Sequence, residues 1–253
     1  MFDANEWEIL ITSSLPFLNI FKFKFGCHRT YEDFVVLNFK QFQTDFWVKQ
    51  HQWCTQILFE KFLLYTHTVP YLSNIFKLEL NSRKSSNELV NVSSIFDKVT
   101  NLTLSHEQIT DKCLYRFPNL ISLKIVILEQ EIIDSSISKY LKMIVNLSNL
   151  KHLDISQYQR LILSGELLII LKESSQLSSL TINPKDLILL FSDNELCEYL
   201  NKMIKKLNMY KHDHSLFDDL NEMKIFCRIF SNIEQVKCSI NQPERILFLL
   251  CRL

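Results

Sequence analysis

Glycine is nearly absent from this 253-residue chain, which contains only Gly26 and Gly165. Phosphate-cradling loops, dinucleotide-binding turns and nucleophile elbows require clustered glycines, because their backbone adopts positive φ or lies close to a ligand. Two isolated glycines cannot form any of these motifs. The sequence therefore excludes the common glycine-based nucleotide and hydrolase sites, and we expect no cofactor and no catalytic residues.

An excess of charge of either sign is also missing, because 28 Lys and Arg balance 28 Asp and Glu. No overall field therefore attracts nucleic acid or an anionic membrane. No uninterrupted apolar run approaches the ~20 residues that span a bilayer, and residues 1–6 lack the basic and then apolar order of a signal peptide. We expect a cytoplasmic protein, with the nucleus as the alternative, and neither a membrane nor a nucleic acid as partner.

The seven cysteines lack the close spacing of a metal site, and their odd number and wide separation do not suggest a disulfide framework. Most have apolar neighbours, which predicts buried thiols in a reducing compartment. The densest group of other metal ligands is Lys-His-Asp-His at 211–214. A chelate there would need Asp218 or Asp219 to fold back, so a solvated loop is the favoured interpretation and we expect no metal.

A six-residue pattern with apolar residues at positions 1, 4 and 6 recurs along the chain, and its clearest copy is Leu150, Leu153 and Ile155. From Ile75 onward the copies begin at 75, 99, 120, 150, 177, 204 and 233, so the steps are 21 to 30 residues. Strands this short bury their apolar side only by stacking side by side with helices between them. The pattern predicts an α/β right-handed solenoid with parallel strands on the concave face and helices on the convex face.

Helical spacing of apolar residues occurs between the copies. The predicted helices carry the sets Leu89/Val92/Phe96, Ile137/Tyr140/Leu141/Ile144, Leu167/Leu168/Leu171, Leu196/Tyr199/Leu200/Met203 and Leu220/Met223/Cys227/Phe230. Ser192 lies three residues before Glu195, the spacing of a capping box, and Ser164 precedes the third of these sets.

The N-terminal part is less regular. Asp3 and Glu6 have capping-box spacing and predict a helix over 5–13, which Pro16 follows. An outlying copy of the pattern at Leu18, Phe21 and Phe23 predicts a strand over 18–25, followed by a turn at Gly26 and a helix that includes Val35, Phe39 and Phe42.

Segment 45–71 breaks the repeat, because Trp53, Thr55, Ile57 and Phe59 alternate in the manner of a strand. Either a β-hairpin insertion or a degenerate repeat would fit, and the alternation favours the hairpin. Its aromatic residues are suited either to fill an irregular core or to form a ligand platform, and the core is the favoured interpretation. They are Phe46, Trp47, Trp53, Phe59 and Tyr65.

The whole chain is expected to form one domain, 1–253. It would comprise irregular units over 1–74, regular repeats over 75–241 and a C-terminal helix over 243–253. That helix is apolar on nearly every face, whereas a solenoid needs a polar outer side on its last unit. We therefore expect either that the chain continues or that another chain covers this end.

The six-residue pattern with helices between its copies resembles the leucine-rich repeat, specifically the long, irregular repeats in the C-terminal halves of F-box proteins. The resemblance covers residues 75–239 well. Position 9, which holds Asn or Cys in the family, is occupied here by Arg83, Glu107, Leu128, Tyr158, Lys185 and His212, so the asparagine ladder is missing. An F-box itself is not recognisable, because the segment 7–18 is too brief.

Strand geometry predicts which residues meet a partner, because alternate side chains point to opposite faces. Positions 3, 5 and 7 of each copy should form the outward, concave face. The residues expected to bind a partner there are Lys124, His152, Asp154, Thr181, Lys206, Asn208, Tyr210 and Lys237. The surface is polar and mixed in charge, which suits a specific protein contact.

The sequence thus leads to two functional expectations. The first is a non-enzymatic protein-interaction module, which the resemblance makes more specific: the substrate-recognition arm of an F-box-type ubiquitin-ligase adaptor, joined to the ligase core through an F-box that this chain lacks or that lies upstream. The alternative is an enzymatic or ligand-binding domain with segment 45–71 as a pocket wall. Only His51, Glu60 and His67 would supply titratable groups there.

Overall fold

The computed structural model describes residues 3–28, 40–59, 63–78, 83–86, 95–111, 113, 115–126, 137–157, 164–209 and 220–238. The chain is mixed α/β and forms two compact units, Met1–Val99 and Thr100–Leu253. The single domain expected over 1–253, with its sections 1–74 and 75–241, stays a prediction. The helix expected over 243–253 lies outside the described residues.

The first unit contains a four-stranded antiparallel sheet in the order β1-β3-β2-β5. Its strands are β1 (Lys24–His28), β2 (Thr55–Phe59), β3 (Leu63–Thr68) and β5 (Arg83–Ser86), and the unit also has a further strand, β4 (Ile75–Leu78). Strands β2 and β3 pair from Thr55–Thr68 to Phe59–Leu64. They are the hairpin expected within segment 45–71, and they also pair with β1 and β5.

Helix α1 (Ala4–Ser14) corresponds to the helix expected over 5–13. Asp3 is its N-cap, since Asp3 Oδ1 accepts a 2.8 Å hydrogen bond from the backbone N–H of Asn5. Such a bond satisfies one of the N–H groups that have no partner within a helix. A π-helical turn, η2 (Phe46–Gln50), precedes β2.

The strand expected over 18–25 is wrong, because residues 18–23 are not in a strand and β1 begins at Lys24. The turn expected at Gly26 is wrong for the same reason: Gly26 lies within β1, directly opposite Tyr65 of β3. The apolar side chains here serve an antiparallel sheet and a nearby aromatic cluster rather than a parallel repeat. The helix expected at Val35 and Phe39 lies outside the described residues.

The second unit contributes six strands, within its described residues, to a parallel sheet in the order β11-β10-β9-β8-β7-β6. They are β6 (Asn101–Ser105), β7 (Ser122–Val126), β8 (His152–Gln157), β9 (Ser179–Thr181), β10 (Lys206–Met209) and β11 (Gln235–Cys238). Spatial order therefore follows chain order in this unit.

Position 4 of the repeat forms one row across this sheet. The register pairs five leucines in succession, Leu102, Leu123, Leu153, Leu180 and Leu207, and each is 2% exposed or less. These five leucines therefore form one buried column across the sheet. Position 1 of the copy at 75 differs from the expected pattern, because Ile75 in β4 is 61% exposed, although Leu78 at position 4 of the same copy is 1% exposed.

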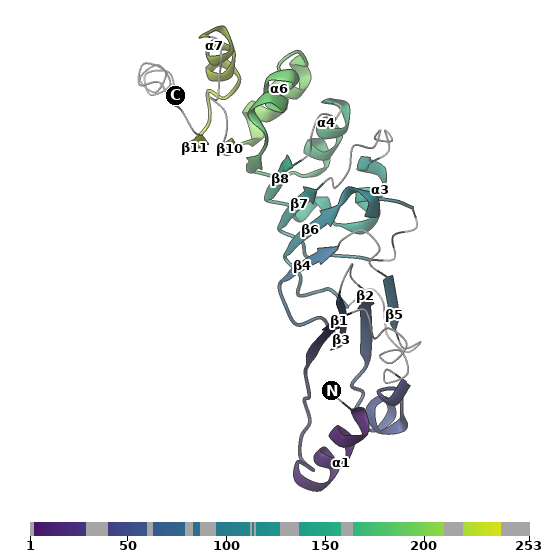
Figure 1. The fold of residues 1–253 in the computed structure, drawn as a ribbon. Helices are drawn as coiled ribbons and strands as arrows, with labels where there is room; N and C mark the ends of the chain where they lie inside the picture. The colour runs from purple at the N-terminus through teal and green to yellow at the C-terminus, as the bar shows by residue number, and fades with distance from the viewer. Residues whose placement is uncertain are drawn as a thin grey trace. The chain divides into compact units, whose positions relative to one another are not determined.

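Helices follow the strands of the second unit on one side of the sheet (Figure 1). They are α3 (Ile137–Ile144), α4 (Ser164–Glu173), α5 (Pro184–Leu190), α6 (Asn194–Met203) and α7 (Leu220–Ile229), with 3₁₀ turns η4 (His106–Gln108) and η5 (Leu147–Asn149). Four of these helices match the predicted apolar sets. The set around Leu89 and Val92 lies outside the described residues.

Two details of the helices differ from expectation. The capping box at Ser192 is wrong, because Asp193 is the N-cap of α6 and its Oδ1 accepts a 3.0 Å bond from Leu196 N–H. Helix α5 was not expected, although Asn183 Oδ1 accepts a 3.1 Å bond from Lys185 N–H and Pro184 begins the helix, both usual start signals.

The helices are short throughout the described part of the chain. The longest, α1, has 11 residues. None of the described helices has the length and apolar character that crossing a bilayer requires.

Candidate partner-binding surface

The sheet of the second unit has one apolar and one polar face because its side chains alternate. Leu153 and Ile155 of β8 are buried, whereas His152 is exposed and Asp154 and Ser156 are half-buried. The same alternation occurs in β6, β7, β9 and β10. We call the side that carries His152 and Asp154 the polar face.

Backbone register arranges the polar face into two rows. One row contains Asn101, Ser122, His152, Ser179, Lys206 and Gln235, and the other contains Thr103, Lys124, Asp154, Thr181, Asn208 and Lys237. Adjacent members of a row lie on adjacent strands, about 4.8 Å apart. Together the rows form a continuous polar surface that crosses the strands.

Seven of the eight residues expected to bind a partner lie in these rows. Lys124, Asp154, Thr181, Asn208 and Lys237 share one row, and His152 and Lys206 lie in the other. Tyr210 lies outside the described residues. The structure therefore gathers the expected residues on one face, while their role in binding stays a prediction.

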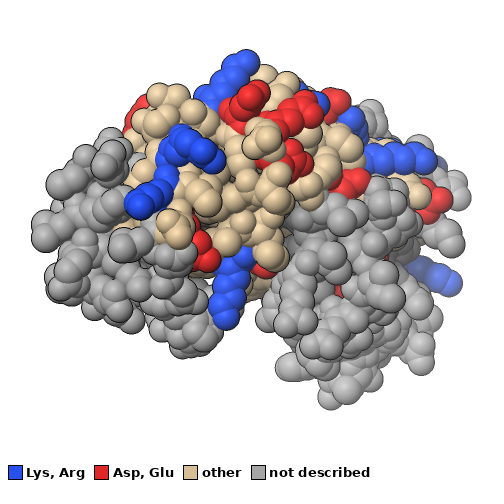
Figure 2. Space-filling model, turned by 90° about the horizontal axis from the view of Figure 1, so that it is seen from above, with Lys and Arg blue, Asp and Glu red and all other residues tan. Residues whose placement is uncertain are grey.

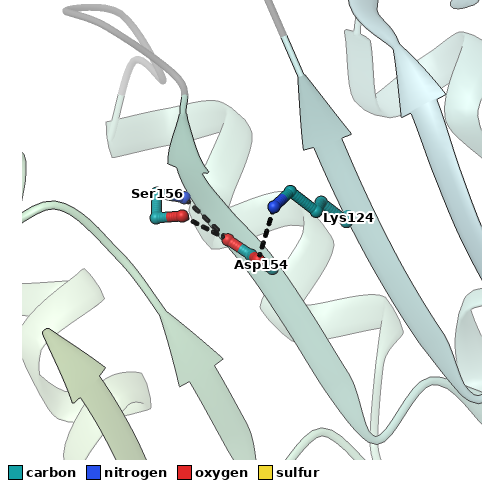
Figure 3. A network of polar contacts seen from close by, with 3 residues as sticks. All are labelled: Lys124, Asp154 and Ser156. Carbon is teal, nitrogen blue, oxygen red and sulfur yellow. Dashed lines mark hydrogen bonds and ion pairs between the residues drawn. The ribbon is translucent and has the colours of Figure 1, made fainter. Parts of the chain in front are cut away.

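Asp154 is the centre of one network of polar contacts on this face (Figure 3). Lys124 Nζ on the neighbouring strand lies 3.5 Å from Asp154 Oδ2. Ser156 donates twice to Asp154 Oδ1, from its backbone N–H at 3.0 Å and from its hydroxyl at 2.7 Å. These three contacts restrain the orientation of the Asp154 carboxylate.

The ion pair itself adds little stability, because the side chains of Lys124 and Asp154 remain 35% and 29% exposed. Pairs as accessible as this contribute at most about 1 kcal/mol. The contribution of Lys124 and Asp154 is therefore geometric, since the pair holds charges of opposite sign at fixed positions on adjacent strands.

A third row runs along the N-terminal margin of the sheet and was not among the expected binding residues. It contains Thr100, Ile121, Lys151, Ser178, Lys205 and Glu234, each of which precedes a strand at position 2 of the repeat. A backbone ladder holds it: Lys151 N–H donates to Ile121 O at 2.8 Å, and Lys205 N–H donates to Ser178 O at 2.9 Å. Lys205 Nζ also lies 3.9 Å from Glu234 Oε1. We call this row the margin.

Charges of both signs are interspersed over the side of the molecule that Figure 2 displays. The pattern agrees with the equal totals of basic and acidic residues. Any preference of the protein for charged partners must therefore arise from a local arrangement of side chains.

The described residues of the polar face are not arranged as a metal site or as an enclosed acid–base site. No group of three His, Cys, Asp or Glu side chains is placed to hold a metal ion in the part of the chain that the structure describes. Residues 211–214, the densest sequence cluster, lie outside that part. His152 and Asp154 lie on a sheet surface, whereas acid–base catalysis usually requires a pocket that excludes water.

Four of the described cysteines lack the environment of reactive thiols. Burial raises the pKa of Cys54, Cys113, Cys197 and Cys238, so each thiol is largely protonated near neutral pH. The thiolate is the nucleophilic form. These cysteines are therefore poor nucleophiles.

The aromatic residues of segment 45–71 test the alternative hypothesis that this segment forms the wall of a ligand pocket. Phe46, Trp47 and Trp53 are 7%, 0% and 7% exposed and belong to one apolar cluster. Their rings pack on one another, with 5.9 Å between the centroids of Trp47 and Trp53. His51 stacks on Trp53 at 4.1 Å. Phe46, Trp47 and Trp53 thus fill a core, as the favoured interpretation of the sequence predicted for them.

A surface depression in the first unit has a volume of about 550 Å³. Its lining residues are Asn5, Glu8, Ile9, Thr12, Ser13 and Thr44. None of the aromatic residues of segment 45–71 lines it, and it contains one titratable group. The depression does not bring together the groups that the pocket alternative needs.

Comparison of the chain with protein-family models, with curated proteins and with solved structures finds no match.

Proposed function

We propose that this chain is a non-enzymatic protein-interaction module and that a protein partner binds its polar face. The single observation that supports this best is the register that aligns seven predicted binding residues in two adjacent rows. A row of side chains on successive parallel strands offers an extended surface without a deep cavity. Such a surface suits a protein chain better than a small molecule.

The module is proposed to be a right-handed leucine-rich-repeat-like solenoid. Three observations support this: spatial order follows chain order, the position-4 leucines align in one column, and the helices lie on one side of the sheet (Figure 1). Each strand–helix unit buries its apolar side against its neighbours, which is the stabilising principle of repeat proteins.

The more specific role is the substrate-recognition arm of an F-box-type ubiquitin-ligase adaptor. Its support is the resemblance of the repeats to the irregular repeats of F-box proteins, and fold resemblance alone does not identify a substrate. The role implies a cytoplasmic or nuclear location and a linked F-box that docks on the ligase core.

The experiment compares two variants of the tagged full-length gene product in the source cell. The face variant, His152→Ala with Asp154→Ala, removes the centre of the polar face. The control variant, Lys139→Ala with Glu198→Ala, removes one basic and one acidic side chain from helices α3 and α6. Proteins that co-purify are quantified by mass spectrometry, and circular dichroism verifies the fold of each variant.

The proposal expects at least one protein to be lost with the face variant and retained with the control. If every co-purifying protein survives the face variant in a folded chain, the polar face is not the binding surface. The adaptor role further expects a ligase core component in both samples. Its repeated absence would leave only the general interaction module.

A further inference from the structure

The charges of the polar face and its margin are not balanced, although those of the whole chain are. Within the three described rows, the basic residues are Lys124, Lys151, Lys205, Lys206 and Lys237, and the acidic residues are Asp154 and Glu234. The three rows thus contain five ammonium groups and two carboxylates. All seven lie on or before the five strands β7 to β11, so the excess extends across most of the surface.

Both carboxylates already have a basic neighbour. Asp154 lies 3.5 Å from Lys124 Nζ and also accepts two bonds from Ser156. Glu234 lies 3.9 Å from Lys205 Nζ. The acidic groups of the surface are therefore compensated locally, and they do not offset the remaining lysines.

Three lysines of the rows lie outside these two pairs: Lys151, Lys206 and Lys237. Lys151 and Lys206 are both exposed, and neither forms an ion pair with a described residue. Lys151 precedes β8, and Lys206 begins β10, two strands away, so the two residues lie on the order of 10 Å apart across the strands. An extended segment that crosses the strands along this margin would pass both residues.

We propose that the partner presents an acidic, extended segment to this surface. The inference rests on the proposed function and adds the charge of the partner to it. Carboxylates spaced along the segment complement Lys151 and Lys206, while the two compensated acidic groups repel it little. Electrostatic complementarity of this kind raises the association rate and excludes basic competitors.

Nucleic acid is the other polyanion that five lysines could attract, and the described rows favour protein over it. No Phe, Tyr or Trp occurs in the three described rows. Single-stranded nucleic acid binds strongly where bases stack on aromatic rings beside a basic groove. An acidic peptide needs no stacking platform.

The test uses fluorescence anisotropy with the full chain and two labelled peptides of ten residues, alternating Glu-Ser and alternating Gln-Ser. The face variant is Lys151→Glu with Lys206→Glu. The matched control is Lys139→Glu with Lys224→Glu, which changes the net charge equally but on helices α3 and α7. Both peptides are titrated in 20 mM and 500 mM NaCl, and labelled oligo-dT of ten nucleotides is the competing probe.

We expect the Glu-Ser peptide to bind the wild-type chain more tightly than the Gln-Ser peptide in 20 mM NaCl, and 500 mM NaCl to abolish the difference. The face variant should weaken Glu-Ser binding about tenfold or more, and the control less than about twofold. Equal effects of the two variants would overturn the proposal. So would the absence of a preference for Glu-Ser, or tighter binding of oligo-dT.

Failure here is distinguishable from failure of the proposed function. A co-purifying partner that is lost with His152→Ala and Asp154→Ala, but is insensitive to Lys151→Glu with Lys206→Glu, would keep the interaction module and reject the acidic segment. A partner insensitive to both variants would reject the binding surface itself.

Discussion

The ring of Tyr65 lies against Gly26 on the neighbouring strand, so that a Cβ added at Gly26 would approach Tyr65 Cε1 to 2.8 Å. Gly26 belongs to β1, an edge strand of the antiparallel sheet in the first unit, and the aromatic ring lies against one side of this residue, which is otherwise exposed. Lys24 Nζ in turn lies 4.4 Å from the centre of the Tyr65 ring, which restricts how far the ring can move. The position therefore requires glycine for space rather than for backbone freedom.

We expect the two glycines of the chain to respond in opposite directions to alanine. Gly26→Ala overpacks the contact with Tyr65 and should lower the free energy of unfolding by about 1–3 kcal/mol. Gly165→Ala should raise it by about 0.5–1 kcal/mol, because Gly165 lies in α4 with no atom within 4 Å of the added Cβ. Urea denaturation followed by circular dichroism measures both values. Rescue of Gly26→Ala by Tyr65→Leu would tie the loss to the ring, and a neutral Gly26→Ala would contradict the argument.

A second prediction concerns the start of α3, which a neighbouring helix caps. Glu166 Oε2 of α4 accepts a 2.7 Å hydrogen bond from the backbone N–H of Ser138, and both residues are buried. Glu166→Ala would leave that N–H buried without a partner and remove an anion from the helix N-terminus. We expect a loss of about 1–3 kcal/mol in the free energy of unfolding.

Glu166→Gln retains an acceptor oxygen and should lose less than about 1 kcal/mol. The control is Glu173→Ala, which breaks the half-exposed ion pair with Lys142 on the same helix pair and should also cost less than about 1 kcal/mol. If Glu166→Ala cost no more than Glu173→Ala, the buried cap would contribute nothing beyond a surface charge.

The second unit was largely predictable because its information is local. Apolar residues at fixed spacing identify each strand. The parallel register then follows if every copy of the pattern buries the same position. Leu123 and Leu153 thus pair as the pattern implies. The start of α6 was missed by one residue because Ser192 and Asp193 both have capping side chains, and only the structure distinguishes them. Helix α5 has just two buried leucines, too few to show a helical period.

The first unit was poorly predictable because its contacts are distant in sequence. Phe21 and Phe23 have the same spacing as a repeat copy, but Phe23 is buried in the aromatic cluster with Trp47. Gly26 meets Tyr65 through antiparallel pairing of two strands that no local pattern links. The hairpin of β2 and β3 was the exception, since both strands lie within one short segment.

On the polar face, too, features that depend on one strand were predictable, and features that depend on neighbouring strands were not. Alternation within each strand correctly placed Lys124 and Asp154 on one side. Their ion pair needed the additional fact that β7 and β8 are neighbours, paired at these two residues. Opposite charges at position 5 of successive copies were a usable signal. The margin was missed because position 2 precedes the strand, where the alternation rule does not apply.

A third prediction concerns acid stability of the first unit. His67 is fully buried, and burial lowers its pKa to about 4 from an ordinary value of 6.5. Its Nδ1 donates to Thr68 O at 2.9 Å, so the neutral ring is satisfied on that side. Below pH 6.5 the unfolded chain binds a proton that the native chain does not. The contribution of His67 to native stability therefore falls as pH decreases from about 6.5 to about 4, by about 3 kcal/mol in total.

Tryptophan fluorescence isolates this effect, because Trp7, Trp47 and Trp53 all lie in the first unit. Urea denaturation of the wild type and of His67→Leu is compared between pH 7 and pH 4. The variant should lose less stability than the wild type over this interval, whatever its stability at pH 7. Parallel losses in the two proteins would show that other groups control the acid response. His51→Leu is the control, since the pH dependence should persist in it.

The last prediction concerns the leucine column of the second unit. Leu180 is fully buried within the row, directly paired with Leu153 on one side and Leu207 on the other. Leu180→Ala would leave a cavity between stacked units and should lower the free energy of unfolding by about 2–5 kcal/mol. Leu189→Ala is the control, because Leu189 lies on α5, removes the same atoms and is 67% exposed. It should change the free energy by less than about 0.5 kcal/mol.

Far-UV circular dichroism follows the loss of the whole fold, and tryptophan fluorescence follows the first unit alone. A cavity in the column acts on the unit that contains Leu180, so the dichroism transition should move to lower urea concentration. The size of this shift reports how strongly neighbouring strand–helix repeats depend on one another, since repeat proteins are stabilised chiefly by the interfaces between repeats. A similar small change for Leu180→Ala and Leu189→Ala would mean that the column is not a packed core, and the stacking principle behind the proposed solenoid would fail with it.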